Sequence, residues 1–194
     1  MLESVNWIRD ALNMGRQVDD GNNISLVYAH NKMCFQFDMS KWRRSEFSNG
    51  KYPDSAGKSY SVNGSFYLPS YATDLSMGGL ILMQWHSRYQ EEPGVPLNLQ
   101  VRGNRLLIQQ CQDECEFIYD EPVIYDRWVP VRFEYNWRDQ IKVWIDGKHV
   151  VSVGKHSIAE HSPYWKFGAY RIGDHSQTFP RITMYWSDVR KTNE

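Results

Sequence analysis

The sequence predicts an all-β protein, folded as a single-domain β-jelly-roll sandwich over residues 1–194. From about residue 24 onward, apolar and polar residues alternate in short runs, which is the pattern of strands with one buried face. Turn signals such as Gly103-Asn104 and Asp146-Gly147 lie between neighbouring runs, as β-hairpins require. With 194 residues, 14% of them aromatic, the chain can bury one sizeable core and requires no second domain.

The expected elements follow in order along the chain. A short N-terminal helix is predicted over residues 4–14, because Ser4 can cap its start and four apolar residues have helical spacing. After a turn at residues 19–23 the period changes to two. Strands are predicted at 24–29, 33–38, 44–48, 60–68, 79–87, 96–102, 105–111, 116–119, 129–137, 140–146, 149–153, 164–171 and 181–189.

Composition excludes some partners. The formal net charge of −1 argues against a strongly basic protein of the kind that binds nucleic acid. No segment reaches the ~18 apolar residues that a membrane span needs, so no membrane partner is expected. The first residues lack a charged region followed by an apolar stretch, so we expect no export signal in the chain as given. We expect a monomer.

The three cysteines are too few for a disulfide framework. Cys111 and Cys115 could pair across a tight turn in an oxidising compartment. The odd count and the absence of CxxC pairs favour free thiols instead. We expect no metal site built on cysteine.

The most informative stretch is the predicted strand at 164–171, whose two faces differ in chemistry. Because side chains alternate along a strand, Trp165, Phe167 and Ala169 share an apolar face that packs. The opposite face carries two phenols, a cation and a gap, in the order Tyr164, Lys166, Gly168 and Tyr170. This face suits an anionic ligand that lies across a sheet better than it suits a core.

Other strands offer polar rows that could join this face. Gln84 and His86 share one face of the strand at 79–87, and alternation places Leu82 with them. Three polar residues project from each of two further strands, and together the rows are expected to form the floor of a concave groove. These rows are Asn98, Gln100 and Arg102, and Arg132, Glu134 and Asn136.

Three motifs in order resemble the signature of the jelly-roll polysaccharide lyases, which include alginate lyases, glucuronan lyases and the heparin lyase I type. Trp85 in the middle motif is more similar to the heparin and glucuronan branches, and Phe47, Ser48 and Arg171-Ile172 depart from the alginate-lyase pattern. The departures count against alginate as the substrate. The motifs are Arg44-Ser45-Glu46, Gln84-Trp85-His86 and the run from Tyr164 to Tyr170.

The resemblance implies an enzyme that cleaves a uronic-acid-containing anionic polysaccharide by β-elimination. It implies that Arg44 and Gln84 neutralise the substrate carboxylate and that Tyr170 protonates the leaving oxygen. The C5 proton goes to His86 or to Tyr170 itself, and both routes stay open. Glu46 is expected to form a structural ion pair with Arg44. Further substrate-binding residues are expected to be Lys166, Tyr164, Arg102, Gln100, Asn98 and Arg171.

Two other functional classes remain as alternatives. A non-catalytic carbohydrate-binding sandwich would share the aromatic residues and the polar groove. A glycoside hydrolase of sandwich fold needs two carboxylic acids beside the scissile bond, and the sequence has no Glu-x-Asp-x-x-Glu strand.

The resemblance requires no cofactor and allows a structural Ca²⁺, although no loop has EF-hand spacing. An extracellular substrate implies secretion or release by another route, such as phage lysis. Loops at 49–59, 88–94 and 154–163 are long enough to cover a groove.

Overall fold

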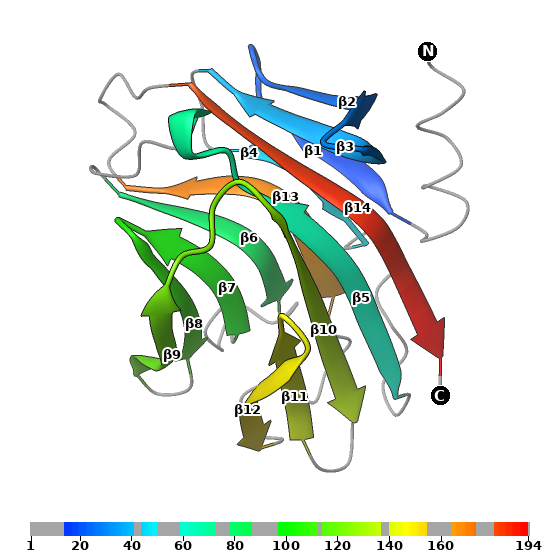
Figure 1. Ribbon diagram of the computed structural model, residues 1–194. Helices are drawn as coiled ribbons and strands as arrows, with labels where there is room; N and C mark the ends of the chain where they lie inside the picture. The colour runs from blue at the N-terminus through cyan, green and yellow to red at the C-terminus, as the bar shows by residue number, and fades with distance from the viewer. Residues whose placement is uncertain are drawn as a thin grey trace.

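The computed structural model describes residues 14–40, 44–49, 59–72, 78–86, 97–111, 114–136, 140–154, 164–173 and 181–193. These residues form two antiparallel sheets of seven strands each, which pack face to face (Figure 1). The first sheet contains, in spatial order, β1 (Gly15–Val18), β4 (Arg44–Ser48), β13 (Tyr164–Ile172), β6 (Gly79–His86), β7 (Leu97–Arg102), β8 (Arg105–Cys111) and β9 (Cys115–Pro122). The second sheet contains β12 (Lys148–Gly154), β11 (Gln140–Ile145), β10 (Trp128–Asn136), β5 (Tyr60–Tyr67), β14 (Ile182–Asn193), β3 (Lys32–Met39) and β2 (Asn23–Ala29).

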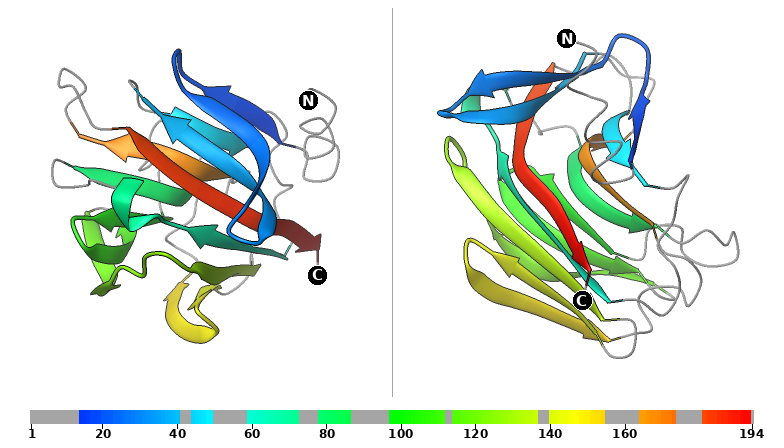
Figure 2. Two further views of the ribbon diagram at one scale, coloured as in Figure 1. Left: turned by 45° about the horizontal axis from the view of Figure 1, so that its top comes forward. Right: turned by 90° about the vertical axis from the view of Figure 1, so that its right-hand side faces the viewer.

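The prediction of an all-β jelly-roll sandwich is confirmed. The right-hand view of Figure 2 shows the two layers, with β13 in one and β14 in the other. The thirteen predicted strands all occur, and a 3-10 turn at Ser70–Ala72 adds to them. No helix in the described residues is long and apolar enough to cross a membrane. The predicted N-terminal helix and most of each predicted groove loop lie outside the described residues.

One strand was not predicted. β1 follows directly where the helix was expected to end, and it pairs with β4 at the edge of the first sheet. Its four residues, Gly-Arg-Gln-Val, contain a single apolar side chain and therefore no alternation that a sequence pattern could reveal. The strand exists because β4 offers it an edge with which to form hydrogen bonds.

The core lies between the two sheets and is rich in aromatic side chains. Trp85, Trp165 and Trp186 are fully buried there. The indole Nε1 of Trp85 donates a hydrogen bond of 3.1 Å to the hydroxyl of Tyr60 on the other sheet. Burial of such large rings supplies much of the free energy that holds the layers together, at ~25 cal/mol for each Å² of apolar surface.

The register shifts at several places in the first sheet, and one shift changes which side chains of β6 face outward. β6 shifts its register against β7 between Ile81 and Met83, so that Leu82 and Met83 both pack in the core. The prediction that Leu82 shares a face with Gln84 is therefore wrong, because the extra residue reverses the alternation at that point. Ile81, which pairs with Gln100, takes the outward position instead.

The same region of β13 depends on a glycine. Gly168 has φ of +137°, a conformation that L side chains rarely adopt. A Cβ at this position would lie 2.5 Å from the carbonyl oxygen of Ser45 on β4. The gap that the sequence shows between Lys166 and Tyr170 is therefore needed for close approach of two backbones.

The expectation of free thiols at Cys111 and Cys115 is wrong. The two cysteines form a disulfide, and they face each other as register partners where β8 turns into β9. Adjacent antiparallel strands bring opposed Cβ atoms within disulfide distance, a proximity that cysteine spacing alone does not reveal. Cys34 is free and buried.

Candidate active site

The three sequence motifs meet because β13 lies between β4 and β6 (Figure 1). Tyr170 pairs with Arg44 on β4, while Lys166 pairs with Gln84 on β6. Paired residues of neighbouring strands point to the same face. These side chains therefore share the face of the first sheet that points away from the second sheet, which we call the polar face.

Glu46 is at the centre of the polar side chains. Its Oε1 accepts a hydrogen bond of 2.6 Å from Nε2 of Gln84. Its Oε2 lies 3.6 Å from Nε of Arg44 and 3.9 Å from Nζ of Lys166. One carboxylate thus holds a guanidinium, an ammonium and an amide from three adjacent strands.

Burial controls the titration of this group. Glu46 is 1% exposed, and its burial raises the pKa to about 7, although Lys166, Arg44 and the hydrogen bond from Gln84 act in the opposite direction. Burial also lowers the pKa of Lys166, and the charge of Glu46 partly offsets this effect. The expected ion pair between Arg44 and Glu46 is present, and it is one part of a larger charged group.

The two phenols of β13 stand in different surroundings. The guanidinium of Arg44 lies over the ring of Tyr170, 5.5 Å from its centroid. Tyr164 pairs with His86, and their rings stack with centroids 4.9 Å apart. Tyr170 pairs with Ile81 on β6, five residues before His86, so the two catalytic candidates share a face and are offset along the strand direction.

A ladder of amides continues the polar face onto β7 and β8. Nε2 of Gln100 donates to Oδ1 of Asn98 at 2.9 Å and to Oε1 of Gln109 at 3.1 Å. Nε of Arg102 donates to Oε1 of Gln100 at 2.8 Å, and the guanidinium lies over the ring of Phe117. Asn98 and Gln100 are buried. Amides that are bonded to one another in this way form a fixed polar network beneath this part of the polar face.

The comparisons with known proteins agree with this arrangement. A family model described as polysaccharide lyase matches residues 11–190. The chain belongs to this polysaccharide lyase family. A comparison with curated protein sequences finds no match.

Solved structures similar to this polysaccharide lyase include alginate lyases. One from Corynebacterium sp. is 13% identical with a TM-score of 0.64, over 91% of this chain and 83% of that chain. An alginate lyase in complex with dimannuronate is 13% identical with a TM-score of 0.65, over 83% of this chain and 74% of that chain. The binding domain of a botulinum neurotoxin, in complex with rat synaptotagmin II, is also 13% identical, with a TM-score of 0.59, over 91% of this chain and 43% of that chain. Identities this low show the fold alone.

Most predicted site residues of the polysaccharide lyase come together on the polar face. Arg171 does not, because it pairs with the core residue Leu80 and lies on the other side of β13 from Tyr170. The row formed by Arg132, Glu134 and Asn136 belongs to the second sheet and does not join the predicted groove floor. The residues that come together are Arg44, Gln84, His86, Asn98, Gln100, Arg102, Tyr164, Lys166 and Tyr170.

Sequence reasoning missed the central place of Glu46 and the contribution of β8. Glu46 is two residues from Arg44 on one strand, so alternation places both on one face, and this signal was available. Gln109 could not be assigned in the same way, because the register of β8 against β7 sets its contacts with Asn98 and Gln100.

Proposed function

We propose that this polysaccharide lyase cleaves a uronic-acid-containing polysaccharide by β-elimination on the polar face. The observation that carries the proposal is the gathering of Arg44, Gln84 and Lys166 around Glu46, on the face that also holds Tyr170 and His86. Two cations and an amide donor in one place suit a carboxylated sugar. The similarity in fold to an alginate lyase solved with dimannuronate supports the same substrate class.

The chemistry requires these residue types together. β-Elimination removes the C5 proton, which is weakly acidic because it is adjacent to the carboxylate, and expels the sugar oxygen at C4. Negative charge grows on the carboxylate in the transition state. Fixed donors from Arg44 and Gln84 would stabilise this charge without reorganisation during the reaction. Lys166 would bind the same carboxylate or the next one along the chain.

Proton transfer is assigned to Tyr170 and His86. Tyr170 would protonate the C4 oxygen, and the guanidinium over its ring would stabilise the negative charge left on the phenol. If the proton and the oxygen leave from the same side of the sugar, Tyr170 can perform both transfers. If they leave from opposite sides, a second group is needed, and His86 is the candidate.

The test is ultraviolet absorbance at the wavelength of the unsaturated product, with glucuronan, alginate, heparin, heparan sulfate and hyaluronan as substrates. We expect the wild-type protein to produce this product from one of them and Tyr170→Phe to reduce the rate at least ~100-fold. Tyr28→Phe is the matched control, since Tyr28 is 70% exposed on the second sheet.

The variants also separate the two proton-transfer routes. A large loss in His86→Ala would assign the base to His86, and full activity would assign both transfers to Tyr170. A large loss in Tyr164→Phe with full activity in Tyr170→Phe would move the acid to the end of the polar face where His86 stacks on Tyr164. Release of saturated products, or no product from any substrate, would refute β-elimination.

A further inference from the structure

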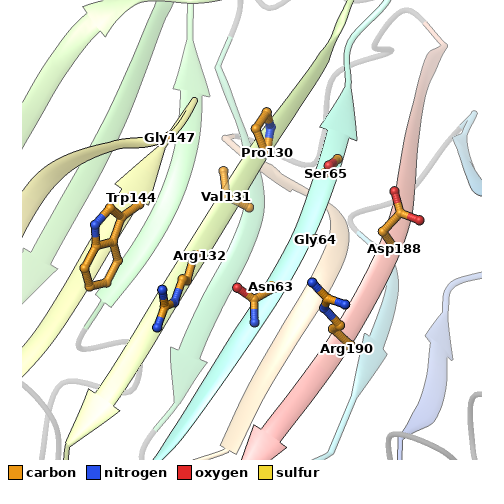
Figure 3. A pocket seen from close by; sticks show the side chains of 10 residues that line it. All are labelled: Asn63, Gly64, Ser65, Pro130, Val131, Arg132, Trp144, Gly147, Asp188 and Arg190. Carbon is orange, nitrogen blue, oxygen red and sulfur yellow. The ribbon is translucent and has the colours of Figure 1, made fainter.

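The second sheet has a hollow on the face that points away from the core. The hollow has a volume of about 640 Å³ and is lined by residues of β5, β10, β11 and β14 (Figure 3). Four lining side chains form one row across these strands, because Trp144 pairs with Arg132, Arg132 with Asn63, and Asn63 with Arg190. We call this hollow the trough. It lies on the opposite side of the sandwich from the polar face.

The trough exists because β5 carries only small or short polar residues on this face. Asn63 and Ser65 form its floor, while the longer side chains of Arg132 and Arg190 project from the strands on either side. Neighbouring strands lie ~4.8 Å apart, so these two arginines start ~10 Å from each other across the floor. The result is a hydroxyl and amide floor between two cationic walls.

A bulge in β14 directs Arg190 to this face. β14 shifts its register against β5 between Ser187 and Arg190, and Asp188 in the bulge has φ of +57°. Without the extra residue, alternation would turn Val189 outward and Arg190 toward the core. The carboxylate of Asp188 is held by Nζ of Lys32 at 2.6 Å and by Oγ of Ser187 at 3.1 Å.

The arginines differ in how far their charges are already engaged. Arg132 forms an ion pair with Glu134 and lies over the ring of Trp144, 5.0 Å from its centroid. Arg190 is exposed and forms no ion pair or hydrogen bond within the described residues, but its positive charge helps to lower the pKa of Asp188, which also lines the trough. Lys142 adds a further cation on β11, in register with Glu134. The carboxylates of Glu134 and Asp188 offset part of this charge, so these residues leave only a small positive surplus on a protein whose formal net charge is −1.

We propose that the trough is a second, non-catalytic binding site for an acidic polysaccharide chain. A guanidinium binds a carboxylate through two parallel hydrogen bonds. The serine and asparagine floor offers partners to sugar hydroxyls, and the half-buried indole of Trp144, with the guanidinium of Arg132 over its ring, lines one side of the trough. Only the choice of ligand rests on the proposed function. Such a site would keep a long polymer attached while another part of it occupies the polar face.

The first experiment measures binding by affinity electrophoresis in gels that contain alginate or heparin, with dextran as the neutral probe. We expect Arg190→Gln to weaken binding to the acidic polymers about tenfold, as the loss of one charge-assisted contact predicts. Arg181→Gln is the matched control, because it removes one positive charge from an exposed arginine beside β14. Thermal unfolding of both variants would verify that they fold.

Specific outcomes would overturn the proposal. If Arg190→Gln and Arg181→Gln weaken binding to the acidic polymers equally, the effect comes from the overall charge of the protein and not from the trough. Equal competition by polyglutamate or by a DNA oligonucleotide would show a surface that binds any polyanion and not a sugar site. Hydrogen–deuterium exchange gives an independent readout with an alginate oligosaccharide as the probe. Protection is expected in residues 128–136 and 182–193, and protection confined to the first sheet would contradict the proposal.

The test of the trough and the test of β-elimination can give different results. If no polymer yields unsaturated product but Arg190→Gln still weakens binding, the trough remains a binding site and β-elimination fails. If the product forms and the trough variants bind as the wild type does, β-elimination stands and the second site fails.

Discussion

Replacement of Glu46 by glutamine should change how the stability of the protein depends on pH. Glu46 is buried between Arg44, Lys166 and Gln84, and burial raises its pKa from 4.5 to about 7. A folded state that holds a proton more tightly than the unfolded state is stabilised by low pH. The contribution of Glu46 is therefore fully present below its unfolded-state pKa of 4.5, and it is lost as the pH rises through about 7.

The size of the effect follows from the two pKa values. The interval from 4.5 to about 7, at ~1.4 kcal/mol for each pH unit, corresponds to about 3 kcal/mol of unfolding free energy. Glutamine keeps the shape of the protonated acid and cannot ionise, so Glu46→Gln should not lose this amount. The response of Lys166 adds to this difference between the wild type and the variant. Glu46→Gln removes the negative charge that partly offsets the effect of burial on Lys166, so the pKa of the Lys166 ammonium falls further in the variant.

The assay is urea unfolding of both proteins at about pH 5 and about pH 8. Between these two conditions, we expect the wild-type protein to lose about 2 to 3 kcal/mol more unfolding free energy than Glu46→Gln, because pH 5 already lies above the unfolded-state pKa of 4.5. Glu121→Gln, which changes an exposed glutamate of β9, is the control and should follow the wild type. Parallel losses in the wild type and in Glu46→Gln would refute the assignment of this pH dependence to Glu46.

Two further predictions concern the first sheet. Gly168→Ala should destabilise the protein by several kcal/mol in urea unfolding, because the strained φ alone costs ~1–3 kcal/mol and the added Cβ overlaps the backbone of β4. Gly154→Ala, where a Cβ meets nothing within 4 Å, should change stability little, and equal effects of the two variants would argue against the close approach. Replacement of Cys111 and Cys115 by serine should cost ~2 kcal/mol, as expected for a short closed loop. A thermal midpoint unaffected by these replacements would show that the disulfide does not constrain the unfolded chain.

Much of the fold could be predicted from the sequence because alternation is a local signal. The runs in β7, β10 and β13 place one set of side chains in the core and the other set outside, as the structure has them. Alternation fails where a strand is apolar on both faces. The four apolar residues Leu80–Met83 give no sign of the bulge in β6, so the outward position of Ile81 could not be predicted.

The candidate site was predictable only in part, since it depends on which strands become neighbours. Arg44, Gln84 and Lys166 are far apart in sequence, and no local pattern shows that β13 lies between β4 and β6. The resemblance to a family of known fold supplied this adjacency. The same limitation explains the error with Arg132, whose projecting row has the polar character of the groove but lies on the other sheet.

The register of β13 determines whether the polar face exists at all. A slip by one residue would turn Lys166 and Tyr170 toward the core and expose Trp165. Two features of the structure oppose this slip. Asn49 accepts a hydrogen bond from the backbone N–H of Trp165 at 2.7 Å, and its own N–H donates to the carbonyl of Trp165 at 3.2 Å. The second feature is the bulge of β13, which Gly168 permits and which ends at Tyr170, four residues after Lys166. The strand is therefore fixed on both sides of Lys166. Asn49 and Gly168 thus help to set the geometry on which the proposed chemistry depends.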